Sequence, residues 1–397
     1  MFPNTSPELA ADLQKRWDEI QPGIKGLDAG ALMVCTPVNL LYLTGRVFNG
    51  FVWLPRKGPP QIFMRRMTPE DAAPNVHAIR NPEEIPKILL DNNLPVGKWA
   101  LEGEELAWGN HVRLSRLCEA SMNSQPASGS GLLRRARSIK TPYETAIMRE
   151  GGLRQARAIT TFSRLYKPGM TDHQFALECE HVIRRAGSLG LFRINGQSME
   201  CFMGSVLAGC NAAAVSPYDF ALGGAGLDPS LPVGQNGTKL EPGMTVMVDV
   251  AYNCRGYLTD CSRTYSVGKP PEEALAAHKC CVEIQHTVAK AMQPGVVAEK
   301  LYQMALDMAA AAGYADRFMG LAQKAKFIGH GTGLYINEWP VIGARAAHEI
   351  CVGNVIALEP KIVLPGIGAV GVEDTFVVTE TGAENITPCA QKLMELE

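Results

Sequence analysis

The sequence predicts a chain of two domains, of which the first is an α/β domain. Its length of 397 residues exceeds what one hydrophobic core usually organises. Its first third alternates between helical and strand-like patterns, which is typical of an α/β domain. A Ser/Gly-rich stretch at residues 128–131 then interrupts the pattern, and we interpret it as a linker between the domains.

The elements of the first domain follow from local periodicity. An amphipathic helix is predicted over residues 8–26, and helical patterns recur further along the domain. Short apolar runs, one pair of them separated by a Pro/Gly turn, predict the strands. The predicted strands are 31–35, 51–54, 61–64 and 99–101, and the later helices lie near 83–92 and 111–121.

The second domain is predicted to open with two helices. The first begins Thr141-Pro-Tyr-Glu144, a capping-box spacing with proline at the first helical position. The second is predicted over 171–186. The later elements are strands near 198–207 and 244–267, helices near 271–292 and 296–312, and strand and turn patterns to the end.

Composition excludes several classes of protein. The net charge is −2 with 20% charged residues, and no basic stripe is available for nucleic acid. No apolar run reaches the ~18 residues of a membrane helix, and the N-terminus has no signal-peptide pattern. The 11 cysteines are scattered without a CxxC pair, which favours reduced thiols in the cytoplasm over a disulfide framework.

Two carboxylates are predicted to face each other across a hairpin. Asp249 lies in an apolar strand-like run, and Asp260 lies in the returning run after a turn at 253–256. With the turn centred between Cys254 and Arg255, the two acids are directly opposite. Cross-strand Cβ atoms are about 5 Å apart and like charges there are destabilising. Such a pair requires a cation between the acids or a shared proton.

A second hairpin repeats this arrangement. Glu359 and Glu373 are equidistant from Gly366, so they also can face each other. His330 stands between glycines in Gly-His-Gly-Thr-Gly, a segment without the lysine and the spacing of a P-loop. Four carboxylates and one imidazole form a hard, oxygen-rich donor set. Such a set suits two divalent ions such as Mn, Co, Fe or Zn.

These residues resemble the metal ligands of the pita-bread metallopeptidase family, in the branch of aminopeptidase P, prolidase and creatinase. The resembling features are the Asp249–Asp260 step, the GHGxG around His330, the ALEP at Glu359 and the VEDT at Glu373. Upstream, the segment 39–45 resembles the N-terminal domain of that branch. The resemblance implies a creatinase-like α/β domain over 1–130, an α+β pita-bread catalytic domain over 131–397, and a homodimer.

The resemblance also implies a role for each ligand. Asp249 would chelate one metal ion, Asp260 and Glu373 would bridge two, and His330 and Glu359 would complete the other. Two divalent ions, with manganese the first expectation, would activate a bridging water, and Glu359 would accept its proton. The implied activity is that of an Xaa-Pro aminopeptidase or dipeptidase acting on short peptides.

Three positions depart from the family pattern. Asn337 stands where the peptidases carry a second histidine, and Ser216 stands near the place of a further one. We therefore take Asn337 and Ser216, with Glu359, as the candidate catalytic residues. Gly371 replaces the arginine of the proline-specific members. Two alternatives remain open: a non-peptidase enzyme that cleaves a small amide, amidine or C–S compound on the same metal site, and a metal-binding protein without turnover.

Overall fold

The computed structural model describes residues 1–94, 97–196 and 201–397. The chain forms two compact units, Met1–Arg137 and Ser138–Glu397. The division lies at the end of helix α5 (Ser130–Ser138), which begins inside the stretch interpreted as a linker. That interpretation is wrong for residues 130–131. Leu133 is fully buried, and this packing recruits the Ser/Gly residues into a first helical turn.

The first unit is an α/β domain around one six-stranded sheet, in the order β4-β3-β2-β1-β5-β6. The strands β1, β2 and β3 pair in antiparallel fashion, and β4, β5 and β6 join in parallel. The strands are β1 (Ala31–Val34), β2 (Gly50–Pro55), β3 (Gln61–Met64), β4 (Val76–Ala78), β5 (Trp99–Leu101) and β6 (Ala127–Ser128). The helices are α1 (Pro7–Gly26), α2 (Pro37–Thr44), α3 (Ile85–Asp91) and α4 (Trp108–Met122).

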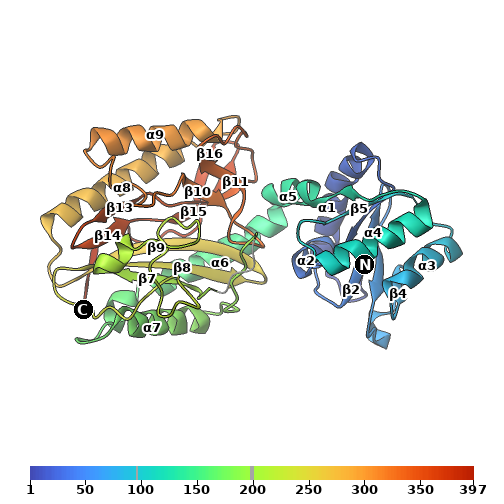
Figure 1. Cartoon of the computed structure of the whole chain (residues 1–397), viewed down its shortest axis with the longest axis horizontal. Coiled ribbons are helices and arrows are strands. Elements are labelled where there is room, and N and C mark those ends of the chain that lie inside the picture. Colours follow the sequence, from blue (N-terminus) through green and yellow to red (C-terminus); the bar gives the residue numbers. More distant parts are fainter. Residues whose placement is uncertain (95–96, 197–200) are drawn as a thin grey trace. The chain divides into compact units, whose positions relative to one another are not determined.

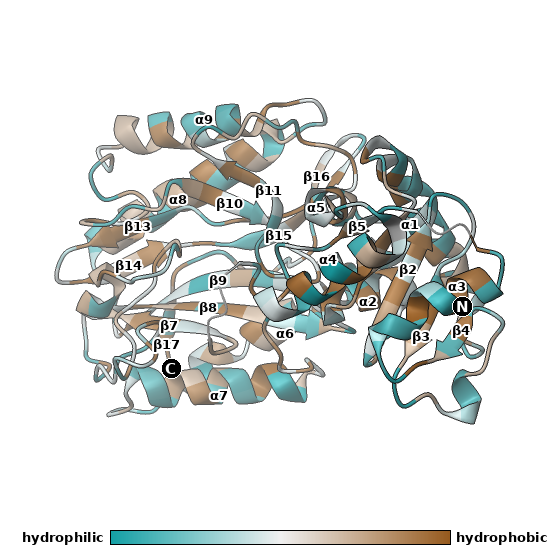
Figure 2. Cartoon of the chain, turned by 45° about the vertical axis from the view of Figure 1, so that its right-hand side comes forward, coloured by the Kyte–Doolittle hydropathy of each residue, from teal (hydrophilic) through white to brown (hydrophobic). Residues whose placement is uncertain are grey.

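Four helices cover the strands of the second unit. Two of them, α8 (Glu272–Ala291) and α9 (Ala298–Ala311), lie on one side of the strands, and α6 (Pro142–Ile159) and α7 (Asp172–Arg185) lie on the other (Figure 1). The predicted capping box of α6 is confirmed, because the Thr141 side chain accepts from the backbone of Glu144. Hydrophilic and hydrophobic residues alternate along α7 and α9 (Figure 2), as expected for helices with one buried face.

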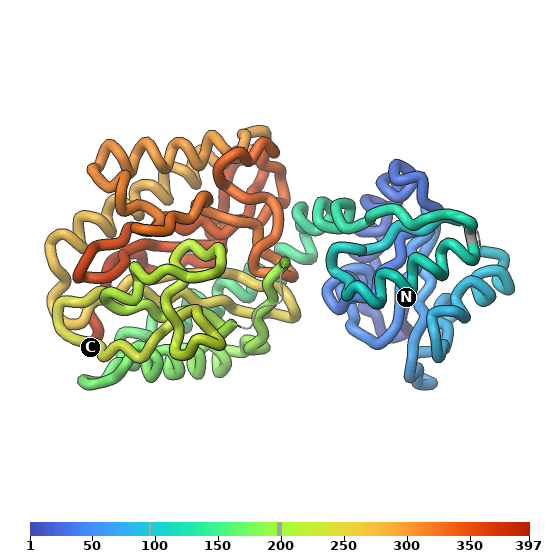
Figure 3. Tube along the Cα trace, viewed as in Figure 1, coloured from blue at the N-terminus to red at the C-terminus, as the bar shows by residue number. Residues whose placement is uncertain are grey.

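The strands of the second unit form three groups, in the orders β17-β9-β8-β7, β11-β10-β12-β15-β16 and β13-β14. The first group is β7 (Gly204–Ala208), β8 (Thr245–Cys254), β9 (Tyr257–Val267) and β17 (Met394–Leu396). The others are β10 (Phe327–Gly331), β11 (Glu338–Gly343), β12 (Val355–Leu358), β13 (Lys361–Leu364), β14 (Gly368–Gly371), β15 (Asp374–Thr379) and β16 (Gly382–Asn385). The C-terminal β17 returns to pair with β9 in parallel (Figure 3).

The strand predicted near 198–207 is β7 in its described part, and its residues 198–200 lie outside the described residues. Among the residues described, no helix is both long and apolar enough to cross a membrane.

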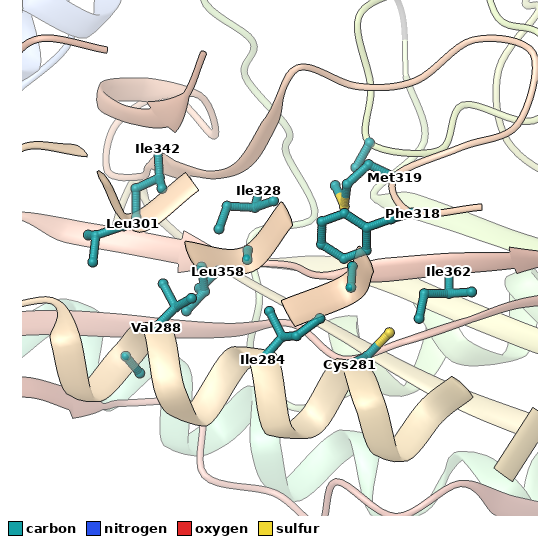
Figure 4. Packing of buried hydrophobic residues seen from close by; sticks show 14 of the residues in the cluster. Cys281, Ile284, Val288, Leu301, Phe318, Met319, Ile328, Ile342, Leu358 and Ile362 are labelled. Carbon is teal, nitrogen blue, oxygen red and sulfur yellow. The ribbon is translucent and has the colours of Figure 1, made fainter. Parts of the chain in front are cut away.

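One hydrophobic cluster packs helix α8 against the strands on either side of Glu359. Figure 4 shows Cys281, Ile284 and Val288 of α8 directed toward Leu358 and Ile362, which flank Glu359 and Lys361 in the sequence. All five of these side chains are fully buried. Burying side chains of this size typically contributes about 1.5–3 kcal/mol each. The backbone on both sides of Glu359 is therefore fixed by packing on α8.

Candidate metal centre

The turn between β8 and β9 sets the register of the first hairpin. Arg255 and Gly256 occupy the two turn positions, with φ of 51° and 96°. Two successive positive φ values identify a type I′ turn, the two-residue turn that suits the twist of antiparallel strands. Cys254 consequently pairs with Tyr257. The turn is thus centred between Arg255 and Gly256, one position later than predicted.

This register corrects one prediction. Asp249 pairs with Ser262, and Asp260 pairs with Ala251, so the two acids are not directly opposite each other. Because side chains alternate between faces with a period of two, Asp249 and Ala251 point to the same face. Asp249 and Asp260 are therefore diagonal neighbours on one face, a spacing that long side chains still bridge.

The second hairpin has the predicted register. Leu358 pairs with Asp374 on one side of the site, and Lys361 pairs with Gly371 on the other. Both pairs are symmetric about Gly366. Glu359 and Glu373 lie at matching positions between these two ladders, where neither strand is continuous. The interruption places two acidic side chains opposite each other in the interior of the unit.

The structure brings the five predicted ligands together in two overlapping groups. The ligand atoms of each group all lie within 4.8 Å of one another. One group is Asp260, His330 and Glu373, and the other is Asp249, Glu359 and Glu373. Glu373 belongs to both, so it stands at the centre. His330 reaches the site from β10, where Nε2 lies 3.4 Å from Glu359 Oε1.

A lysine that the sequence analysis did not single out lies inside the second group. Lys361 Nζ is 2.7 Å from Asp249 Oδ2, 2.5 Å from Glu359 Oε2 and 3.7 Å from Glu373 Oε2. Its side chain is 1% exposed. One signal could have revealed it: Lys361 follows Glu359 by two residues, the spacing that puts side chains of an extended segment on one face.

Electrostatics in the cluster reflect four acids in a small buried volume. Burial, together with the charge of Asp249, raises the pKa of Asp260 to about 8. Burial would also raise the pKa of Glu359, but Lys361 and His330 outweigh it and lower that pKa to about 2. Burial alone would lower the pKa of Lys361. The charges of Asp249, Glu359 and Glu373 outweigh this effect and raise that pKa well above its ordinary value. The acids therefore require positive charge in contact with them.

Glu373 shows where a cation fits. Its Oε2 accepts a hydrogen bond of 2.7 Å from Ser262 Oγ. Its Oε1 is buried and has no hydrogen-bond partner among the described residues. A buried carboxylate oxygen without a donor is costly unless a cation binds it. With Asp260 and His330 beside Glu373, the donor set is two carboxylates and an imidazole, which suits a divalent ion of the first transition series.

A cavity of about 380 Å³ opens onto these ligands. Asp249, Asp260, His330 and Glu359 form its polar side. The remaining wall is largely apolar and aromatic, and includes Phe192, Ile194, Phe202, Phe220, Phe327 and Ile336. Concave apolar walls with a few convergent polar groups are typical of small-molecule sites.

Asn337 lines this cavity, as expected, but its amide is already engaged. Oδ1 accepts from the backbone N–H of Asn195 at 2.7 Å, and Nδ2 donates to the Asn195 carbonyl at 3.1 Å. Asn195 itself lines the cavity. The side chain thus holds the backbone of a neighbouring wall segment, whereas the sequence analysis takes it as a candidate catalytic residue.

Ser216 is not brought to the other candidate residues. It is 3% exposed and lines a separate, smaller hollow beside Gln323. Its Oγ accepts from Tyr218 N–H at 3.3 Å, and its own N–H donates to Gln323 Oε1 at 3.2 Å. A Cβ on Gly223 would lie 2.2 Å from Ser216 Cβ, so this position leaves little room for a larger side chain.

A third group of side chains that could bind a metal lies elsewhere in the unit. It consists of Cys261, Asp374 and Cys389. Arg263 is buried against it, with one guanidinium nitrogen 2.7 Å from Asp374 Oδ1. The guanidinium neutralises the acid, so we interpret this group as a structural ion pair.

Comparison with known proteins gives consistent matches. The model of metallopeptidase family M24 matches residues 146–380, and that of the creatinase/prolidase N-terminal domain matches residues 16–139. The Xaa-Pro dipeptidase of Lactobacillus helveticus is 24% identical over 387 residues, which cover 93% of this chain and 96% of that enzyme. The Xaa-Pro dipeptidase of Pyrococcus furiosus is 27% identical over 258 residues, only 65% of either chain.

Solved structures agree on the fold. The Xaa-Pro dipeptidase from Bacillus anthracis superposes with a TM-score of 0.79 at 20% identity, covering 97% of this chain and 100% of that one. The prolidase from Pyrococcus horikoshii OT3 gives a TM-score of 0.76 at 20% identity, covering 96% and 99%. These matches confirm the predicted creatinase-like N-terminal domain and pita-bread catalytic domain.

Proposed function

Because the chain belongs to metallopeptidase family M24, we propose that it is a metal-dependent hydrolase of short Xaa-Pro peptides. The observation that carries this proposal is the convergence of Asp260, His330 and Glu373 at one side of an apolar cavity. Relatives named Xaa-Pro dipeptidase support the substrate class. They do not favour the non-peptidase alternative.

The family implies a divalent metal cofactor, and we propose that Asp260, His330 and Glu373 hold a divalent ion. The unpartnered Oε1 of Glu373 supports this assignment. We propose manganese, because two carboxylates beside one imidazole form a hard donor set. When bound, such an ion acidifies a water ligand and polarises a carbonyl oxygen. The resemblance assigns Asp249 and Glu359 to different ions, whereas the structure groups both of them with Glu373.

The chain's own residues supply the rest of the site. Glu359 keeps Oε1 directed at His330, since its Oε2 is bound by Lys361, and we assign Oε1 as the proton acceptor for the attacking water. The aromatic and aliphatic wall excludes water and offers a surface for an apolar ring such as that of proline. Asn337 positions the Asn195 part of this wall.

A peptide panel tests this function. Full-length protein loaded with Mn²⁺ would be assayed on Xaa-Pro and Xaa-Ala dipeptides and on Xaa-Pro tripeptides. We expect hydrolysis of the Xaa-Pro peptides and its loss in His330→Ala. A metal-loaded protein that cleaves no Xaa-Pro peptide would contradict the proposal. The panel also separates dipeptidase from aminopeptidase activity.

We also propose, from the resemblance to the prolidase-like branch, that the protein is a homodimer. Sedimentation that gives only monomer at micromolar concentration would contradict this. The scattered cysteines, all free in the structure, support the prediction of a reducing, cytoplasmic location.

A further inference from the structure

We propose that the ammonium of Lys361 takes the place of one of the two metal ions, so that the centre binds a single divalent ion at Asp260, His330 and Glu373. The inference rests on the proposed function in identifying the metal ligands. It goes further by assigning the second cation position to the chain itself. The consequence is a mixed centre in which one cation is exchangeable and the other is covalently attached to the protein.

The position of Lys361 Nζ carries the inference. Its contacts of 2.7 Å to Asp249 and 2.5 Å to Glu359 use one oxygen from each of two acids in the second group. Glu373 Oε2 lies 3.7 Å away, so the ammonium is close to all three members of the second group. An ammonium has three N–H donors and no acceptor, which matches a site made only of carboxylate oxygens.

The stem of the lysine is fixed by the β13–β14 ladder. Lys361 pairs with Gly371 across the ladder. A Cβ on Gly371 would lie 2.8 Å from Lys361 Cγ and 2.7 Å from the Pro360 carbonyl, so the glycine provides the room that the lysine stem occupies. The resemblance expects an arginine at position 371. The chain thus lacks a cation at that position and carries one at its direct cross-strand partner.

Movement of the ammonium out of the cluster is opposed by burial. The Lys361 side chain is 1% exposed, and its backbone carbonyl accepts a hydrogen bond of 2.8 Å from Met319 N–H. A buried charge that loses its partners is strongly destabilising. A second divalent ion would have to displace the ammonium from Asp249 and Glu359 while leaving it nearby, where two like charges repel.

The distribution of partners in the cluster points to the same arrangement. Lys361 already binds Asp249 Oδ2 and Glu359 Oε2. Within the described part of the cluster, the buried carboxylate oxygen without a partner is Glu373 Oε1, which belongs to the side of Asp260 and His330.

Metal stoichiometry tests the inference without any activity measurement. Metal-free full-length protein would be titrated with Mn²⁺ by calorimetry, and bound metal would be counted by mass spectrometry. We expect one ion per chain in the wild type, one in Lys361→Arg, which keeps the charge, and two in Lys361→Met, which keeps the apolar stem. Lys140→Met is the matched control, because Lys140 is another buried lysine, paired with Glu338. It should leave the count at one.

A second measurement remains informative if Lys361→Met does not fold. The electron paramagnetic resonance spectrum of the Mn-loaded wild type should show isolated Mn²⁺ without exchange coupling. Two bound ions, or an exchange-coupled spectrum, would overturn the inference and leave a metal-dependent peptidase intact. A wild type that binds one ion but cleaves no Xaa-Pro peptide would instead contradict the proposed function and leave the inference standing.

Discussion

Glu373 is the residue on which both ligand groups depend. It contributes to each group, is 1% exposed, and uses one oxygen for Ser262 while the other has no hydrogen-bond partner among the described residues. A side chain that belongs to both groups fixes the distance between them, and we propose that it also binds the cation. Its removal should therefore affect metal binding before it affects the fold.

We expect Glu373→Gln to weaken Mn²⁺ binding by more than the ~10–100-fold that follows loss of an outer hydrogen-bonding partner of a metal ligand. The amide preserves shape but removes the charge that binds the ion. Calorimetric titration measures the affinity. Glu384→Gln is the control, since Glu384 is half exposed and paired with Arg149 at the surface. Equal Mn²⁺ affinities for wild type and Glu373→Gln would exclude Glu373 as a ligand.

Asn337 yields a prediction that the family pattern alone would not. Restoring the family histidine by Asn337→His should lower kcat/KM for Xaa-Pro peptides, because it breaks both hydrogen bonds to the Asn195 backbone. The metal count should stay unchanged, which separates positioning from metal binding. A rise in kcat/KM would show that an imidazole at 337 acts on the substrate directly and that the hydrogen bonds to Asn195 are dispensable.

Among the elements, the two hairpins position the four acids of the site, because the turn of each hairpin sets which side chains meet. The Arg255–Gly256 turn decides that Asp249 and Asp260 are diagonal neighbours. In the second hairpin, symmetry about Gly366 aligns Glu359 with Glu373. A change in either turn would be transmitted along the ladder to the ligands.

Gly256→Ala tests the first turn. At φ of 96° an alanine is strained, and a left-handed conformation costs roughly 1–2 kcal/mol for a residue with a Cβ. We expect the free energy of unfolding in urea to fall by about that amount. Gly26→Ala is the control, because that glycine ends a helix and an added Cβ would meet nothing within 4 Å. Equal stability of the Gly256→Ala variant and the wild type would contradict the turn assignment.

His278 on α8 gives a pH prediction. Burial lowers the pKa of His278 below its ordinary value, so the folded state favours the neutral ring. The stabilising contribution is complete above the unfolded pKa, about 6.5, and is lost as the pH falls through the lower folded pKa. His278→Gln should therefore lose less stability than the wild type between pH 7 and pH 5 in urea unfolding. Identical pH profiles would rule out this role.

The sequence predicts these elements unevenly, for identifiable reasons. Most of the helices and the Glu359–Glu373 alignment follow from local spacing, and the structure agrees with both, but helix α2 (Pro37–Thr44) was not predicted. The register at Asp249 requires the φ values of residues 255 and 256, which no periodicity specifies. The helix α5 depends on burial of Leu133 against other elements. Lys361 was overlooked because a lysine in a strand is usually a solvated side chain.

Over the whole chain, different features of the sequence predict the two compact units. The first unit is predicted by alternation of helices and strands, and its sheet has the expected α/β character. The second unit is predicted chiefly by five candidate ligands, which lie far apart in the sequence and meet only in the fold. Their convergence, together with the family match over residues 146–380, supports a metal-dependent peptidase.

One titration tests most directly whether the protein is a metal-dependent Xaa-Pro peptidase. Mn²⁺ would be added stepwise to metal-free, full-length protein while hydrolysis of an Xaa-Pro dipeptide is followed. We expect no activity without metal and a rise that reaches its plateau at one equivalent per chain, with Lys361 supplying the second positive charge. Full activity in the metal-free protein, or no hydrolysis at any metal load, would contradict a metal-dependent Xaa-Pro peptidase.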